Sequence, residues 1–408
     1  MRLLFLTPRP IWPLTSGNRL RDYHLSRQLA KRASVTIVEM YSGDQQPSKP
    51  PDDSGFEQII SLHRNGGYTP AKVIRGLTGP TPITVLKYFE PRLASQLTEI
   101  LKRGEFDAVQ IEGIHTSEYL PAIRVVCPSL TVVADWHNIE SELMSRYSEN
   151  ARNWLKRAAA KRTAALLRRS ELRLLETCQV HTVASEREGE KLLACFPSAQ
   201  VHVVPNGVDA DHYSAGETAK LKENAEASAL NGSLLFVGSM DYHANIDAVL
   251  WFTREIWPQL ASRHRELKFG VVGRDPTAEI RNLQSERILI TGTVEDVRPY
   301  YAAAQAVIVP LRVGSGTRLK ILEAMAAGVP IISTRLGAEG IDVSHNVHLL
   351  IADNGPELVS ATEHLLASRE TRNRLAQAAR NRVIDRYDWS VMGQDLFSLY
   401  VSLLSKSR

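Results

Sequence analysis

The stretch GSGTRLKILEAMAAGVPIIST, residues 314–334, decides the fold of this chain. The run AVIVPL (306–311) precedes it and VPIIST (329–334) closes it, and both runs are short, apolar and β-branched, as buried strands are. The pattern therefore predicts a strand, a glycine loop, a helix and a second strand. The helix is indicated by a candidate N-cap, apolar residues at helical spacing and a glycine stop, namely Thr317, Leu319, Leu322, Met325, Ala326 and Gly328.

The glycine loop of this segment predicts a binding site for an anion. Backbone N–H groups at a helix N-terminus carry about half a positive charge and can face a phosphate or diphosphate. Arg318 and Lys320 add full positive charges at this point, and Glu323 follows one turn later, where it can accept hydrogen bonds from a ribose. A plain crossover, with glycines that only form a tight turn and charged side chains in solvent, is the alternative interpretation.

Length and composition predict an ordinary globular chain with two domains. The 408 residues exceed the limit of about 250–300 for a single hydrophobic core. Hydrophobic residues make up 43% and charged residues 23% of the chain, as in typical globular proteins. The net charge of +4 permits contact with an acidic partner, but an excess this small does not indicate nucleic acid.

The N-terminus and the cysteines predict a cytoplasmic protein. No run reaches the roughly 18 apolar residues that a membrane span needs. Three prolines between residues 8 and 13 interrupt the apolar start before the core of a signal peptide could form, so this segment is interpreted as a first strand and loop. Cys127, Cys178 and Cys195 are an odd number without a CxxC pair, which argues against a disulfide framework and a zinc site.

Strands and helices alternate along the chain, with one break. Strands separated by helices, such as the helix expected over 19–32, predict a parallel sheet covered on both faces. The polar segment 215–233 interrupts this pattern, which restarts with SLLFVGS and a helix over 245–260. We therefore expect an α/β chain with two doubly wound, Rossmann-like halves that meet near residue 210. Its ligand should lie in the cleft between them, at the carboxyl ends of the strands.

An ordered set of motifs resembles the family 4 glycosyltransferases. The resemblance implies the GT-B fold: an acceptor-binding domain over 1–210 and a nucleotide-sugar-binding domain over 211–385, both Rossmann-like and facing each other across a cleft. The last helix, 386–408, is then expected to cross back to the first domain. The motifs, in order, are DWHN (135–138), VASE (183–186), VVPNGVD (203–209), FVGSM (236–240), VVGR (271–274), ILITGTVEDVRPYYAAAQAVIVPL (288–311), KILEAMAAGVPIIST (320–334) and YDWSVMGQDLFSLY (387–400).

The resemblance implies transfer of a sugar from a nucleoside diphosphate sugar to an acceptor hydroxyl with retention of the anomeric configuration. Polysaccharide, lipopolysaccharide or glycoconjugate biosynthesis is the expected context. The departing diphosphate would be stabilised by Arg318, Lys320 and the helix N-terminus, so no cofactor and no metal are expected. The scattered histidines provide no convincing metal cluster either.

The donor site departs from the family pattern at two points. The family has two glutamates eight residues apart in this loop; Glu323 matches the second, which holds the ribose, but Ser315 occupies the first position. Many members also place an arginine and a lysine after the glycine matched by Gly238, where this chain has Ser239 and no lysine through residue 245. We expect Arg318 and Lys320 to replace them. The donor-binding residues implied are Gly17, Gly238, Ser239, Gly314, Ser315, Gly316, Thr317 and Glu323, with Thr293 and Val294 contacting the base through their backbone.

In the first domain, His137 matches the family histidine that lines the donor-sugar pocket, and the resemblance implies a catalytic role. From the residues alone, a polar loop residue is the alternative. Asp135 and Glu140 flank it, and a carboxylate could fix the tautomer of the imidazole. Candidates for the acceptor side are Glu112, His115, Asn18 and Arg19, with a solvated loop as the alternative for the first two. His181, inside an apolar strand, is expected to be a core histidine.

Residues 152–173 contain eight Lys or Arg residues and one acidic residue, with apolar residues on one stripe. A basic amphipathic helix could contact anionic lipid headgroups at the inner face of the membrane, which suits a lipid-linked acceptor. A surface helix packed on its own sheet is the alternative interpretation.

Three other functions are alternatives to sugar transfer. A catalytically degenerate nucleotide-sugar-binding subunit is favoured by the missing first glutamate and opposed by the retention of His137, Lys320 and Glu323. An NAD-dependent dehydrogenase is opposed by two observations: no GxGxxG follows the first strand, and GSGTRL at 314–319 lacks the third glycine. An epimerase on the same fold is the third alternative.

Overall fold

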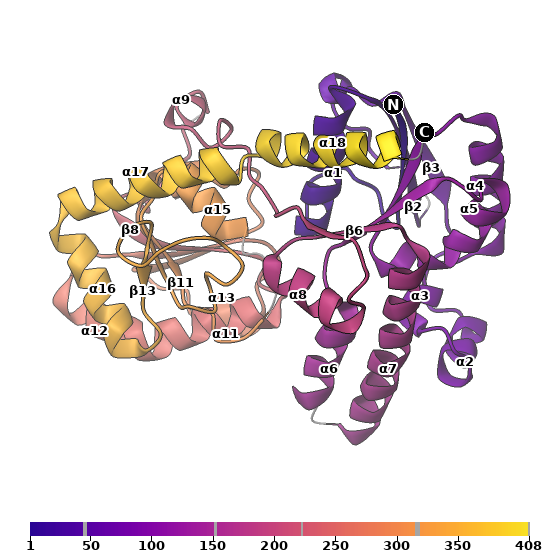
Figure 1. Cartoon of the computed structure of the whole chain (residues 1–408). Coiled ribbons are helices and arrows are strands. Elements are labelled where there is room, and N and C mark those ends of the chain that lie inside the picture. The colour runs from indigo at the N-terminus through magenta and orange to yellow at the C-terminus, as the bar shows by residue number, and fades with distance from the viewer. Residues whose placement is uncertain (44–46, 151–152, 222, 315–318, 407–408) are drawn as a thin grey trace. The chain divides into compact units, whose positions relative to one another are not determined.

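The chain forms two compact units (Figure 1). The computed structural model describes residues 1–43, 47–150, 153–221, 223–314 and 319–406. Unit 1 comprises Met1–Pro205 together with Met392–Arg408, and unit 2 comprises Asn206–Val391. Among the described residues, no helix is both long enough and apolar enough to span a membrane.

Unit 1 is built on a seven-stranded sheet in the order β3-β2-β1-β4-β5-β6-β7, in which every neighbouring pair is parallel. The inner strand β1 is buried from Leu3 to Thr7, because it has strands on both sides and helices over both faces. The strands are β1 (Arg2–Thr7), β2 (Ser34–Tyr41), β3 (Gln58–His63), β4 (Ala108–Glu112), β5 (Thr131–Trp136), β6 (Val180–Val183) and β7 (Val201–Val203).

The helices of unit 1 present one apolar side to this sheet. In α4, for example, Leu93, Leu97 and Leu101 recur every fourth residue and are the buried ones. The helices are α1 (Gly17–Ala30), η1 (Asp52–Ser54), α2 (Pro70–Thr78), α3 (Ile83–Leu86), α4 (Pro91–Arg103), η2 (Ile114–Tyr119), α5 (Leu120–Val126), α6 (Glu140–Asn150), α7 (Trp154–Thr177), α8 (Glu186–Cys195) and the last helix, α18 (Trp389–Lys406), which belongs to this unit from Met392 onward.

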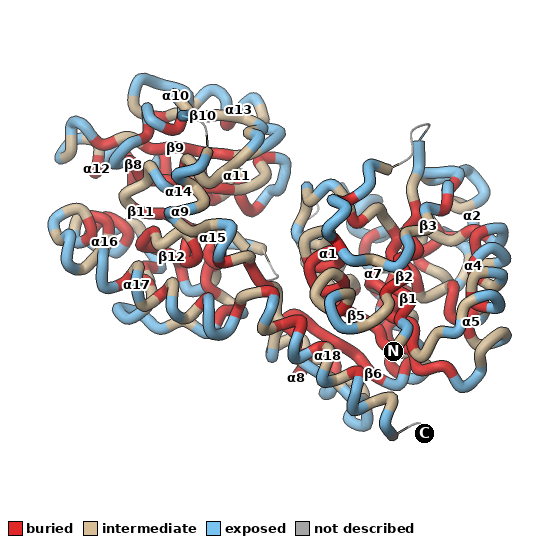
Figure 2. Tube along the Cα trace, turned by 90° about the horizontal axis from the view of Figure 1, so that it is seen from above, coloured by how far each residue is buried: buried red, intermediate tan, exposed pale blue. Residues whose placement is uncertain are grey.

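Unit 2 is built on a six-stranded parallel sheet in the order β10-β9-β8-β11-β12-β13. The strands β8, β9 and β12 are buried along their whole length, and Figure 2 shows the outward side of α17 as exposed. Its elements are α9 (Ala215–Thr218), α10 (Ala225–Ser228), β8 (Ser233–Val237), α11 (His243–Trp251), the π-helical η3 (Phe252–Ile256), α12 (Trp257–Arg263), β9 (Phe269–Val272), α13 (Ala278–Arg281), β10 (Ile288–Gly292), α14 (Arg298–Ala303), β11 (Ala304–Val309), α15 (Leu319–Ala326), β12 (Ile331–Ser333), β13 (Leu350–Ile351), α16 (Gly355–Ala367) and α17 (Arg369–Arg386).

The predicted α/β class with two doubly wound parallel sheets is confirmed. The segment 306–334 forms β11, α15 and β12, and Gly328 ends the helix with φ of 70°, which favours glycine. The helix expected over 245–260 runs from His243 to Arg263 with a π-helical turn inside it. The candidate N-cap Thr317 lies outside the described residues.

Both sheets reverse their strand order at a central pair, β1 and β4 in unit 1 and β8 and β11 in unit 2. Parallel sheets of this order bind ligands at such a switch point, beyond the carboxyl ends of the strands. In unit 1 that edge carries Glu112 and in unit 2 it carries Gly238, two of the residues singled out from the sequence.

Candidate active site

The predicted donor-binding residues of unit 2 gather at the carboxyl edge of its sheet. Gly238 and Ser239 follow β8, and Gly314 lies beyond the neighbouring strand β11. Thr293 and Val294 follow β10, two strands away from β8. Four further predicted residues fall outside the described part of the chain: Ser315, Gly316, Thr317 and Arg318.

Lys320, in the first turn of α15, is held over the loop that follows β8. Its Nζ donates a hydrogen bond of 2.8 Å to Oδ1 of Asn245 and lies 4.0 Å from the centre of the Phe236 ring. Asn245 in turn donates from Nδ2 to the backbone oxygen of Ser239 at 2.8 Å. A Cβ at Gly238 would lie 2.7 Å from Nζ of Lys320, so the close approach of this ammonium group requires glycine there.

Arg274 is a cation of this edge that the sequence analysis missed. Its Nε donates to Oγ of Ser239 at 2.9 Å, and this Oγ donates to Oδ1 of Asp241 at 2.5 Å. The segments that follow β8 and β9 lie so close together here that a Cβ on Gly273 would be 1.9 Å from the backbone oxygen of Gly238. The motif VVGR, a buried strand that ends in glycine and a cation, was the available signal.

Glu323 lies one turn after Lys320 and is held by two tyrosines. The hydroxyl of Tyr301 donates to its Oε2 at 2.9 Å, and the hydroxyl of Tyr213 is a second hydrogen-bonding neighbour. Burial raises the pKa of Glu323, while hydrogen bonds from the tyrosines and the charge of Lys320 act in the opposite direction. Glu323 was predicted from its position in the helix, but its tyrosine partners lie 22 and 110 residues away in the chain and were not predicted.

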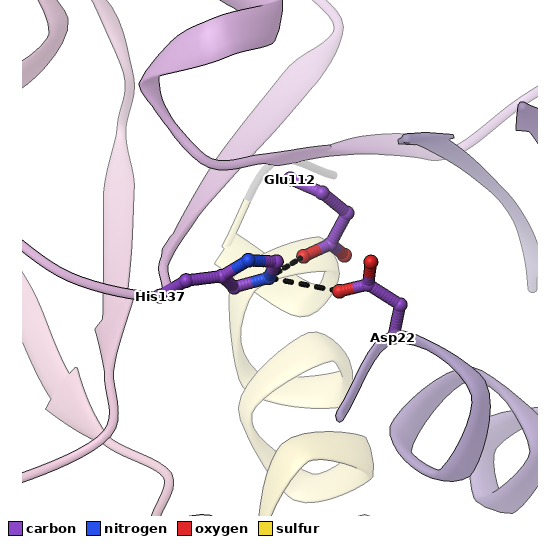
Figure 3. Close-up of side chains that lie close together, drawn as sticks. All are labelled: Asp22, Glu112 and His137. Atoms are coloured by element: carbon purple, nitrogen blue, oxygen red, sulfur yellow. Dashed lines mark hydrogen bonds and ion pairs between the residues drawn. The ribbon is translucent and has the colours of Figure 1, made fainter. Parts of the chain in front are cut away.

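In unit 1, three carboxylates surround one nitrogen of His137, and Figure 3 shows the two nearest of them, Asp22 and Glu112. Nε2 of His137, which follows β5, lies 2.8 Å from Oδ1 of Asp22 on α1, 3.1 Å from Oε2 of Glu112 at the end of β4, and 3.4 Å from Oδ2 of Asp135. The exposed fractions of these side chains range from 0 to 5%. Glu112 is therefore buried at the switch point, and the solvated-loop alternative for this residue is wrong.

This geometry changes the protonation of the cluster. Burial alone would lower the pKa of His137, but the charge of Asp22 and hydrogen bonds to Asp22 and Glu112 outweigh it and raise the pKa to about 10. Burial, with the charges of Asp22 and Asp135, raises the pKa of Glu112 to about 8. At neutral pH we therefore expect an imidazolium at His137 and a protonated carboxyl at Glu112.

Asp135 forms a buried ion pair with Arg21, and this ion pair was not predicted from the sequence. Nε and Nη2 of Arg21 each donate to one oxygen of Asp135 at 2.7 Å, and both side chains are 1% exposed. Although burial opposes ionisation, the charge and hydrogen bonds of Arg21 lower the pKa of Asp135 to about 2. The flanking carboxylates considered from the sequence, Asp135 and Glu140, are thus not the nearest partners of His137.

The ligand-type atoms of Asp22, Glu112 and His137 lie within 4.8 Å of one another. The 2.8 Å separation between Nε2 of His137 and Oδ1 of Asp22 is that of a close ion pair. With one proton on His137 and one on Glu112, the positive charge of the imidazolium balances the negative charge of Asp22, and the three side chains together are neutral. We therefore interpret it as a proton-sharing cluster, and the absence of a metal from the reaction stays a prediction.

The remaining predicted residues of unit 1 surround this cluster or lie in the core. Gly17, Asn18 and Arg19 form the first turn of α1, the turn before Asp22. His115 packs its ring 4.9 Å from that of Tyr88, and burial lowers its pKa to about 3, so it is neutral. His181 is fully buried and accepts a hydrogen bond of 3.2 Å from Nε1 of Trp136, which confirms it as a core histidine.

Stability is expected to fall as the pH rises from about 7 to 10. The pKa of His137 is raised from 6.5 to about 10 and that of Glu112 from 4.5 to about 8, so the folded state holds more protons than the unfolded chain in this range. Thermal unfolding of wild type and His137→Gln between pH 6 and pH 10 measures this, and the variant should show the flatter dependence. Equal slopes would contradict the assigned protonation states.

Comparisons with known proteins agree with this architecture. A family model described as Glycosyltransferase Family 4 matches residues 23–212, and one described as Glycosyl transferases group 1 matches residues 231–368. Lipopolysaccharide 1,2-N-acetylglucosaminetransferase of Salmonella typhimurium is 25% identical over 218 residues, which are 49% of this chain and 56% of that protein. The matched regions thus span about half the length of such curated relatives.

Two solved structures share the fold along the whole chain. Sucrose-phosphate synthase from Thermosynechococcus elongatus has a TM-score of 0.74 at 18% identity and is covered in full, as is this chain. HepE of Anabaena in complex with UDP has a TM-score of 0.64 at 15% identity, over 98% of this chain and 100% of that one. With one family model matching each sheet, this chain belongs to family 4 of the glycosyltransferases, which have the GT-B fold.

Proposed function

We propose that this chain transfers a sugar from a nucleoside diphosphate sugar to an acceptor hydroxyl, with retention of configuration, in the biosynthesis of a polysaccharide, lipopolysaccharide or glycoconjugate. The observation that carries this proposal is the place of Lys320. Its ammonium group is held by Asn245 against Gly238 at the switch point of unit 2, with Glu323 one turn further along α15. The complex of HepE with UDP on the same fold supports a uridine nucleotide as the first donor to test.

Lys320 and the N-terminus of α15 would bind the diphosphate. When the bond between the anomeric carbon and the phosphate oxygen breaks, negative charge develops on that oxygen, and a fixed cation lowers the barrier by stabilising it. Arg318 would contribute from the adjoining loop. Glu323 would accept hydrogen bonds from the ribose hydroxyls, since its carboxylate is already positioned by Tyr301.

His137 would act as a hydrogen-bond donor. With its pKa raised to about 10, it is a poor base at neutral pH. Nε2 is occupied by Asp22 and Glu112, whereas Nδ1 makes no hydrogen bond with a described residue. The Nδ1 proton could thus be donated to an oxygen of the sugar. The acceptor oxygen would bond to the anomeric carbon on the face that the phosphate leaves, and the departing phosphate would take the acceptor proton.

Calorimetric titration with UDP, GDP, ADP and NAD tests this function directly. We expect one nucleoside diphosphate to bind selectively and its sugar derivative to be consumed only when an acceptor is present. Binding of NAD alone would favour a dehydrogenase instead. Donor binding without transfer to any acceptor of a hydroxyl panel would favour a binding subunit, and donor turnover without an acceptor would favour an epimerase.

We further propose that the hairpin of α6 and α7 contacts anionic lipid at the inner face of the membrane, where a lipid-linked acceptor would be reached. The two helices lie side by side and project from unit 1 (Figure 1). Tyr147, Trp154 and Leu155 near the end of the hairpin are 55 to 73% exposed. Residues 154–170 of α7 include six Lys or Arg residues and no acidic residue, which favours a negatively charged surface.

Replacing Trp154 and Leu155 together with serine is expected to reduce binding to vesicles that contain phosphatidylglycerol by at least fivefold, because their apolar side chains would leave water on insertion. Co-sedimentation at two salt concentrations measures this, and wild-type binding should weaken with salt. Val125→Ser is the matched control, since Val125 is 82% exposed on α5 of the same unit. Equal binding of the double variant and wild type would exclude this surface.

A further inference from the structure

A chain of hydrogen bonds joins the C-terminal helix to His137. The hydroxyl of Tyr400 on α18 donates to Oε1 of Gln110 at 2.6 Å, and Nε2 of Gln110 donates to Oε1 of Glu112 at 2.7 Å. Oε2 of Glu112 then lies 3.1 Å from Nε2 of His137. Tyr400, Gln110 and Glu112 are at most 1% exposed, so water does not compete for these bonds.

The direction of this chain follows from the chemistry of its members. The phenol of Tyr400 donates to the amide oxygen of Gln110, and the amide NH₂, which can only donate, therefore faces Glu112. Gln110 and Glu112 are two residues apart on β4 and therefore project from the same face of the sheet. As a result Oε1 of Glu112 receives an N–H, and a proton carried by Glu112 must sit on Oε2, toward His137 and Asp22.

We propose that Tyr400 and Gln110 are positioning residues through which the C-terminal helix controls the protonation of Glu112 and His137. The N–H donated by Gln110 stabilises the ionised form of Glu112. Without the phenol, the amide can turn and present its oxygen to Glu112, which then favours the protonated carboxyl. The effect on protonation involves residues of unit 1 only. An effect of these residues on turnover, by contrast, rests on the proposed function of His137.

Other charged and titratable groups also act on the pair, and the test must separate the phenol from them. They come from each element around the site: Arg21 and Asp22 on α1, Asp135 on β5, His115 in η2 and Glu140 on α6. None of them is altered by Tyr400→Phe, which removes a single oxygen and leaves the buried ring in place.

Histidine-labelled protein and NMR titration of the His137 ring between pH 6 and pH 11 test the proposal, with His137→Gln used to assign the signal. In wild type the ring should report the ionisation of Glu112. In Tyr400→Phe this step should move upward by about 0.5 to 1 pH unit, the size expected for loss of one hydrogen bond to a carboxylate. Gln110→Met should give the same shift, and the double variant should add nothing further, because both act on one chain of bonds.

Tyr119→Phe is the matched control. Tyr119 is also fully buried in unit 1, and its hydroxyl donates to the backbone oxygen of Tyr88 at 2.9 Å, away from His137. It should lose stability without moving the titration. If Tyr400→Phe likewise only lowers stability, α18 merely packs there and the proposal fails. If the NMR step moves but the pH profile of kcat for sugar transfer does not, the chain of hydrogen bonds controls the protonation of Glu112 as proposed. The role assigned to His137 in turnover is then wrong.

Discussion

Replacing Lys320 with alanine is expected to weaken binding of a nucleoside diphosphate about 10- to 100-fold, because a hydrogen bond to a charged group contributes about 1.5–3 kcal/mol. Isothermal titration calorimetry measures the affinity. The loss in kcat of sugar transfer should be larger, about 100- to 1,000-fold, since the charge on the departing oxygen is greatest in the transition state. The ammonium group is already held in place by Asn245 and Phe236, so little ordering is needed on binding.

Lys268→Ala provides the control for this experiment. Lys268 immediately precedes β9, so it lies at the opposite edge of the same sheet, where its Nζ donates to the backbone oxygen of Ala229. Its removal changes the net charge equally and should leave affinity and kcat within twofold of wild type. Unchanged affinity in Lys320→Ala would show that the diphosphate does not bind at the loop after β8, and the proposed donor site would be wrong.

Replacing Arg21 with methionine is expected to destabilise unit 1 by about 3–5 kcal/mol, because it leaves the carboxylate of Asp135 buried without its counter-charge. The guanidinium also donates to the backbone oxygen of Val204 at 2.7 Å, which would lose this partner. For a unit of this size such a loss lowers the midpoint of thermal unfolding by on the order of 10 °C. Differential scanning calorimetry measures it, with the transition of unit 2 as an internal reference.

Arg27→Met on the same helix is the control for the burial argument. Arg27 also pairs with an aspartate at 2.8 Å, but the side chains of Arg27 and Asp53 are 26% and 71% exposed. Exposed pairs contribute only about 0–1 kcal/mol, so this variant should stay close to wild type. Equal effects of the two substitutions would mean that the Arg21–Asp135 pair is less isolated from water than its 1% exposure indicates.

Much of the fold and part of the site could be predicted from local patterns. The strand, glycine and helix signals of 306–334 lie next to one another in the chain, so β11 and α15 followed directly from them. Lys320 and Glu323 were found in the same way, because they share one turn of that helix. His137 and Glu112 were found as polar residues at the ends of apolar strands, which always lie at the carboxyl edge of a parallel sheet.

The partners of these residues could not be predicted, since they come from distant elements. Asp22 and Arg21 are consecutive residues in the middle of α1 and look like a solvated pair in the sequence. Packing of α1 on the sheet buries both of them, Arg21 against Asp135 and Asp22 against His137. Nothing in the spacing of 114 residues between Arg21 and Asp135 indicates that ion pair.

The sequence by itself determined two doubly wound parallel sheets and the strand ends at which polar residues collect, because hydrophobic periodicity and glycine positions act over a few residues. Only the tertiary structure decided the charge states at those ends. Protonation depends on burial and on charges brought within a few ångströms, and it is the joint packing of α1, β4, β5 and α18 that makes His137 a cation and Glu112 an acid.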